Sequence, residues 1–124
     1  MIVVADTTPL ISLMKIDKLA LLQSLFGKVY IPEAVYQELV RNPLFEREAL
    51  IVKNCEYICV IKISDERAVR ILRRATGLDL GESEAIVLTD EQQTDLLLMD
   101  EAKGRAVARQ MGIKIMGTIG RRTS

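Results

Sequence analysis

The sequence contains no histidine and no tryptophan, and aromatic residues make up only 4% of its 124 residues. The lack of histidine excludes Ser-His-Asp triads, Cys-His nucleophile pairs, histidine general bases and the usual zinc sites. The scarcity of aromatic rings argues against a surface that stacks bases on exposed rings, and it requires an aliphatic core. Any chemistry must therefore depend on carboxylates, hydroxyls, lysine and arginine.

The chain also lacks an excess of charge of either sign and a long apolar run. Seventeen basic residues balance seventeen acidic ones, so contact with nucleic acid has to be local or helped by bound cations. Cys55 and Cys59 would lie about 13 Å apart on a strand, which is too far for a disulfide. With no run of 18 apolar residues and no leader peptide, we expect a cytoplasmic protein with reduced thiols and no membrane partner.

Short apolar runs alternate with helical patterns along the whole chain. This alternation predicts an α/β fold, with one parallel sheet covered by helices on both faces. The length suits one domain, which we place at residues 1–118, followed by a short polar tail at 119–124 that is expected to fray. The predicted strands are 2–5, 29–31, 58–63, 96–99 and 113–116.

Asp6 stands where the first predicted strand ends. Ile2–Ala5 is a β-branched run typical of a strand buried on both faces. Thr8 then suits the N-cap of a helix and Pro9 its first position. Asp6 is thus expected at the carboxyl edge of the sheet, where open α/β folds bind their ligands. Taken alone, it could equally well be an aspartate that only ends a strand.

A second aspartate, Asp100, ends the run Leu96–Met99 in the same way. If the two strands are neighbours, Asp6 and Asp100 lie side by side, about 5 Å apart. Carboxylates that close repel each other unless a cation bridges them, and oxygen ligands suit hard divalent ions. Glu38 and Glu84 can add acidic groups from helices. Each glutamate alone would be interpreted as part of a solvated helix face, but four acids at matching ends of a sheet favour a metal site.

Arginines share one face of the predicted helix 64–76, at positions 67, 70 and 74. They are interpreted as a solvated face paired with acids, or alternatively as a stripe that binds a nucleic-acid backbone.

Four acid-bearing motifs and a closing glycine-containing stretch, in order along nearly the whole chain, resemble those of the PIN domain family. The resemblance is to the subfamily of predicted nucleic-acid-binding PIN proteins with an Asp-Thr-Ser-Pro-Leu-Ile first motif. The matching segments are VADTTPLI at 4–11, IPEAVYQEL at 31–39, GESEAI at 81–86, LMDEAKGR at 98–105, and the Gly-Ile to Gly-Thr stretch at 112–118.

This resemblance implies a three-layer α/β/α fold with a five-stranded parallel sheet in the order 3-2-1-4-5. It implies a Mg²⁺- or Mn²⁺-dependent endoribonuclease whose catalytic and metal-binding acids are Asp6, Glu38, Glu84 and Asp100. Thr8 occupies a hydroxyl position that orients substrate or water, and Glu82 and Glu101 are possible auxiliary ligands. The resemblance also implies RNA as substrate, a possible antitoxin that holds the protein inactive as a toxin, and a homodimer.

Two other functions are compatible with the residues. In the first, the acids bind a structural ion or a partner's arginines, so that the domain is a non-catalytic module that binds nucleic acid or protein. In the second, Asp6 or Asp100 is the phosphoacceptor of a receiver-like domain, since doubly wound folds share this edge geometry.

Overall fold

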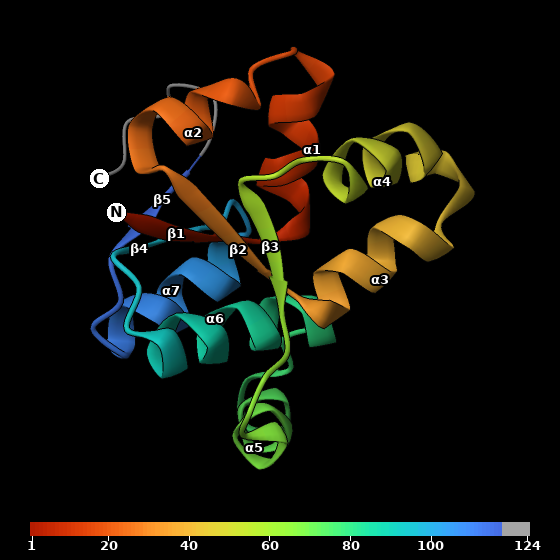
Figure 1. Cartoon of the computed structure of the whole chain (residues 1–124). Coiled ribbons are helices and arrows are strands. Elements are labelled where there is room, and N and C mark those ends of the chain that lie inside the picture. The colour runs from red at the N-terminus through yellow and green to blue at the C-terminus, as the bar shows by residue number, and fades with distance from the viewer. Residues whose placement is uncertain (118–124) are drawn as a thin grey trace.

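A computed structural model describes residues 1–117 of the chain (Figure 1). Strands and helices alternate, as the sequence pattern predicts. The strands are β1 (Ile2–Ala5), β2 (Lys28–Pro32), β3 (Ile58–Ile61), β4 (Leu96–Leu98) and β5 (Ile115–Met116). The helices are α1 (Thr7–Lys15), α2 (Ala20–Phe26), α3 (Glu33–Arg41), the 3₁₀ turn η1 (Pro43–Phe45), α4 (Glu46–Lys53), α5 (Glu66–Thr76), α6 (Leu80–Gln92) and α7 (Ala102–Gln110).

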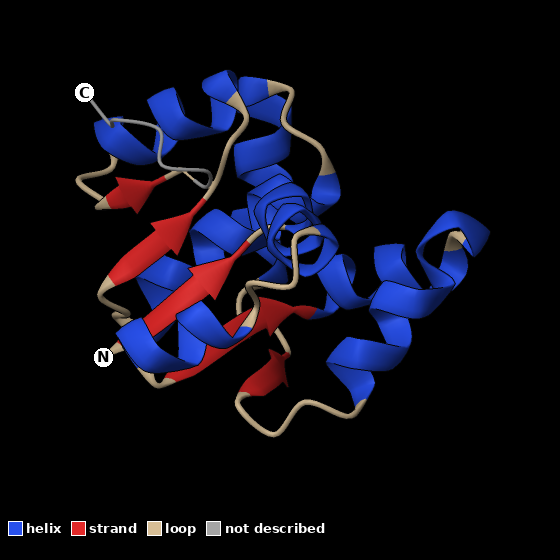
Figure 2. Ribbon diagram, turned by 90° about the horizontal axis from the view of Figure 1, so that it is seen from above, coloured by secondary structure: helices blue, strands red, loops and turns tan. Residues whose placement is uncertain are grey.

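The strands form one parallel sheet in the order β3-β2-β1-β4-β5, so the predicted fold class and strand order are confirmed. Figure 2 shows the strand arrows running the same way with helices on either side. The β-branched strand β1 is central, and its Val3 pairs with Val29 on one side and Leu96 on the other. Strands β3 and β5 are shorter than predicted, since they end at Ile61 and begin at Ile115.

Two aliphatic cores lie on the two faces of the sheet. Successive residues of β1 face opposite ways, so Val3 and Ala5 pack with residues of α1 to α4, while Val4 packs with residues of α5, α6 and α7. In Figure 1, α1 and α2 accordingly lie above the sheet, and α6 and α7 lie below it. Burial on both faces explains why β1 is apolar throughout and why nothing polar occurs before Asp6.

The start of α1 differs from the prediction. We expected Thr8 at the N-cap, but the helix begins at Thr7 and Asp6 is the N-cap residue, with no side-chain capping hydrogen bond. Asp6 has an extended backbone, and its N–H donates to the Leu98 carbonyl of β4 at 3.0 Å. Because the sheet ladder continues through Asp6, the helix starts directly after it.

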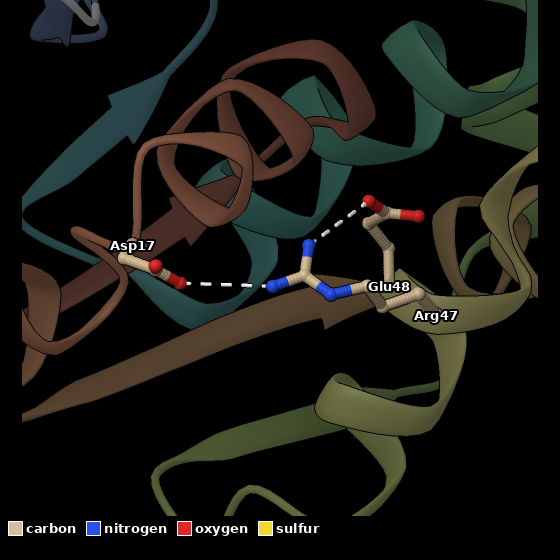
Figure 3. Close-up of polar contacts among 3 residues, drawn as sticks. All are labelled: Asp17, Arg47 and Glu48. Atoms are coloured by element: carbon tan, nitrogen blue, oxygen red, sulfur yellow. Dashed lines mark ion pairs between the residues drawn. The ribbon is translucent and has the colours of Figure 1, made fainter.

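Helix α4 is tied to the turn between α1 and α2 by one arginine. The Arg47 guanidinium lies 3.6 Å from Asp17 and 3.8 Å from Glu48, whose side chain is only 5% exposed (Figure 3). Asp17 has a φ of +55°, which turns the chain sharply after α1. Arg47 therefore neutralises a buried carboxylate and links α4 to the α1–α2 turn on the same face of the sheet.

Both cysteines are free, as predicted. Within residues 1–117, no helix is long and apolar enough to cross a membrane. The predicted fraying of the tail at 119–124 concerns residues that lie outside the described part of the chain.

Candidate functional site

Asp6 lies at the carboxyl edge of the sheet, at the end of the central strand. The residue is only 5% exposed, although carboxylates are rarely buried unless they are paired. Within residues 1–117 no lysine or arginine forms an ion pair with it. A buried acid of this kind at a ligand-binding edge is typical of a functional group.

Burial raises the pKa of Asp6 from 3.8 to about 7. The N–H of Thr7 acts in the opposite direction, and the negative charges of Glu82, Asp79 and Glu38 raise the pKa further. These four acids therefore share one electrostatic field, to which β1, α3 and the start of α6 contribute. Such a surplus of negative charge in a partly buried site favours a proton or a cation.

Glu38 reaches from α3 to the first turn of α6. A Cβ atom placed on Gly81 would lie 3.4 Å from its Oε1 atom, at van der Waals contact, so the Glu38 carboxylate lies directly against Gly81. The positive end of the helix dipole favours a carboxylate there. Burial raises the pKa of Glu38, the adjacent Thr7 hydroxyl lowers it, and the charge of Asp79 raises it.

The hydroxyl of Thr7 lies beside Glu38, whereas the predicted Thr8 is exposed. The Thr7 Oγ1 atom is buried and lies close enough to Glu38 to affect its pKa, but it makes no hydrogen bond of good geometry. The Ser83 Oγ atom in the first turns of α6 is also buried without a partner among the described residues. Orphaned hydroxyls are uncommon in interiors, and two of them flanking an acidic edge are consistent with a missing water or ion.

Glu82 and Glu84 point in different directions. Glu82 and Asp79 form a capping box, in which each side chain accepts from the other's backbone N–H, at 3.1 and 2.8 Å. Glu84 instead accepts from the N–H of Ala34 in α3 at 3.0 Å. Burial raises the pKa of both glutamates, but only the charge of Glu82 acts on Asp6. The structure thus brings Glu82 to Asp6 and places Glu84 against α3.

Asp100 follows β4, and β4 is a neighbour of β1 as predicted. The prediction that Asp100 lies directly beside Asp6 is wrong, because Ala5 pairs with Leu98 and Met99 is therefore the residue level with Asp6. The Asp100 carboxylate lies near the end of β5, since a Cβ atom on Gly117 would be 3.3 Å from its Oδ1 and 2.8 Å from Nη1 of Arg105.

Glu101 lies at the N-terminus of α7. Its side chain accepts from the N–H of Gly104 at 2.8 Å and caps the helix. Its negative charge raises the pKa of Glu82. Glu101 therefore lies within electrostatic reach of the acidic edge, as an auxiliary group would.

The donor set suits a hard divalent cation. Asp6, Glu38, Glu82 and Asp79 offer only oxygen atoms, which Mg²⁺ and Mn²⁺ prefer. In residues 1–117 no three acidic side chains already converge as a metal cluster, so the carboxylates would have to rotate toward a bound ion. A bound ion would stabilise this rotation, because it would offset the cost of burying the Asp6 carboxylate and provide a polar partner for the Thr7 hydroxyl.

A model described as a PIN domain matches residues 2–120, which is nearly the whole chain. The chain belongs to the PIN domain family. A search of curated proteins found no match to this chain. The family is generally one of nucleases that act on nucleic acid with divalent metals, and the acidic edge of this PIN domain has the residue types for that chemistry.

Beside the acidic edge, this PIN domain has an open groove of about 670 Å³ between α3 and α6. Glu38 and Gly81 line it and also belong to the edge, so groove and edge are continuous. Its other lining residues include Gln37, Arg41 and Asn42. A binding region therefore extends from the acids along α3.

Sequence reasoning missed Thr7 and Asp79. Asp79 could have been found, because Asp-x-x-Glu before an apolar run is the signature of a capping box and places both residues at a helix start. No pattern distinguishes Thr7 from Thr8, since both precede Pro9 and either could follow the strand.

Proposed function

We propose that this PIN domain is a metal-dependent ribonuclease that hydrolyses phosphodiester bonds of unpaired RNA with Mg²⁺ or Mn²⁺. The observation that carries the proposal is the buried Asp6 carboxylate, which has no cationic partner among the described residues and lies in the field of three further acids. A structural aspartate at this depth would be expected to have a charged partner, whereas the Thr7 N–H only partly offsets the burial of Asp6.

Asp6, Glu38 and Glu82 would hold the cation. The ladder hydrogen bond to Leu98 fixes the backbone of Asp6, Glu38 lies against Gly81 at the start of α6, and the capping box orients Glu82. When bound, a divalent cation lowers the pKa of water and neutralises charge that develops on the phosphate. The Thr7 hydroxyl would orient Glu38 or a water at the same place.

Glu84 and Asp100 stay predictions from the family motifs. Both lie at the same end of the sheet as Asp6, and rotation of Asp100 toward β1 would bring it to the acids. The antitoxin, the toxin function, the homodimer and the cytoplasmic location also stay predictions.

The test compares wild type with Asp6→Asn on unstructured and hairpin RNAs in Mn²⁺, Mg²⁺ or EDTA, after circular dichroism confirms that both are folded. We expect cleavage that requires a metal and is lost in the variant. Folded wild-type protein that cleaves none of these RNAs with either metal would refute the nuclease. Mn²⁺ binding without cleavage would instead favour the non-catalytic module, and phosphorylation by acetyl phosphate would favour a receiver-like domain.

A matched pair of variants tests whether Glu82 or Glu84 is the third carboxylate that holds the cation, beside Asp6 and Glu38. Glu82→Gln should weaken Mn²⁺ binding and cleavage. Glu84→Gln should have a smaller effect, because its amide oxygen can still accept the Ala34 N–H. The reverse order of effects would assign the third acid to Glu84.

A further inference from the structure

The groove beside the acidic edge carries a cation, Arg41. This residue is at the last position of α3, three residues after Glu38, and therefore lies about one helical turn further along the same side. Both side chains line the groove, and Arg41 is the one cationic side chain among its described lining residues. A chain that enters the acidic edge along α3 would pass Arg41.

A second cation, Lys103, lies at the loop before α6. Its Nζ atom is 2.9 Å from the position of a Cβ atom on Gly77, in the loop that leads into α6. Gly77 has a φ of +76° and offers no side chain, so the lysine lies directly over the loop. Lys103 belongs to α7, which follows β4, whereas Arg41 belongs to α3, which follows β2. Because β1 lies between β2 and β4, the helices that carry the two cations follow strands on opposite sides of the strand that ends at Asp6.

Neither side chain is engaged elsewhere in the described structure. The ion pairs found in residues 1–117 involve Arg47 only, and neither Arg41 nor Lys103 donates a hydrogen bond there. An acidic edge repels a phosphate backbone, and the chain has no net positive charge to offset this. Nearby cations are therefore needed to hold a polyanion at the acids.

We propose that single-stranded RNA crosses the edge from Arg41 to Lys103, and that these two side chains bind backbone phosphates on either side of the one that lies at Asp6. The proposal rests on the ribonuclease function above and assigns the residues that bind its substrate. The groove part of this path is open and is lined by residues at the N-terminus of α6, which leaves room for an extended strand and its unstacked bases.

The test measures how RNA affinity depends on salt. Fluorescence anisotropy of a short labelled single-stranded RNA would be recorded in EDTA between about 50 and 200 mM KCl, with the Asp6→Asn chain as the common background so that no cleavage occurs. Arg41→Gln, Lys103→Gln and the double variant are compared with Lys28→Gln. Lys28 is an exposed lysine that begins β2 at the opposite edge of the sheet, so its loss changes the net charge equally.

We expect each of the two site variants to reduce the slope of log K against log salt by about 0.7, and the double variant by about twice that amount. Lys28→Gln should leave the slope unchanged. The proposed RNA path would be overturned if the slopes for Arg41→Gln and Lys103→Gln equalled that for Lys28→Gln. It would also be overturned if the protein bound no RNA.

Wild-type cleavage with Mn²⁺ is measured separately. Cleavage with unchanged slopes would refute the proposed RNA path but would still support the proposed nuclease function. Reduced slopes without any cleavage would support the RNA-binding path and refute the nuclease.

Discussion

The charge on Asp6 should make the stability of the fold depend on pH. In the folded chain the pKa of Asp6 is about 7, whereas an unperturbed aspartate has 3.8. Between these values the folded chain keeps a proton that the unfolded chain has released. The free energy of unfolding therefore falls as the pH rises from about 4 to about 7.

The size of this effect follows from the shift. One pKa unit corresponds to about 1.4 kcal/mol, so ionised Asp6 should destabilise the fold by about 4 kcal/mol once the pH is above 7. The asparagine introduced by Asp6→Asn keeps the shape of the side chain without an ionisable group. The unfolding free energy of the variant minus that of wild type should thus increase by about 4 kcal/mol as the pH is raised from about 4 to about 8.

Urea unfolding followed by circular dichroism at a series of pH values measures this difference. Asp90→Asn removes an exposed acid at the far end of α6 and serves as the control for the loss of one carboxylate. A difference between Asp6→Asn and wild type that does not change with pH would refute the argument that burial of Asp6 is costly.

The remaining predictions concern a divalent ion, Gly81 and Arg47. At a hundredfold excess over its Kd, Mn²⁺ should stabilise wild type by about 2.7 kcal/mol at neutral pH and Asp6→Asn far less; equal gains would place the ion elsewhere. Gly81→Ala should raise the unfolding free energy by up to about 1 kcal/mol, yet weaken Mn²⁺ binding in calorimetry, because the new Cβ would contact the Glu38 carboxylate at 3.4 Å and restrict its rotation toward an ion; unchanged binding would contradict this. Arg47→Ala should cost about 1 to 3 kcal/mol in urea unfolding because Glu48 is left buried without its cation, and adding Glu48→Gln should recover much of the loss; no recovery would contradict the explanation.

The arrangement of the sheet could be predicted because its signals are local. A β-branched run identifies β1, and Asp65 marks the start of α5, where its side chain accepts the N–H of Ala68. The motif order then implies the strand order through family resemblance, and the structure confirms it.

The detailed geometry of the site could not be predicted in the same way. Glu82 and Glu84 are two residues apart, so they lie on opposite sides of α6, and only tertiary packing decides which one faces Asp6. The position of Asp100 depends on the register between β1 and β4, in which a shift of one residue changes the neighbour of Asp6. Both choices are made by long-range packing, which short sequence motifs do not encode.

The pairing of β1 with β4 has a consequence for the order in which the domain is made. The strand that completes the surroundings of Asp6 is Leu96–Leu98, which the ribosome adds only after six of the helices and two other strands that follow β1. A ribosome-bound chain would carry this aspartate without its neighbour until most of the domain had been translated. Because such distant contacts form late and slowly in folding, a chain interrupted before β4 would have no assembled acidic edge, and any nuclease activity would begin only when the whole sheet closes.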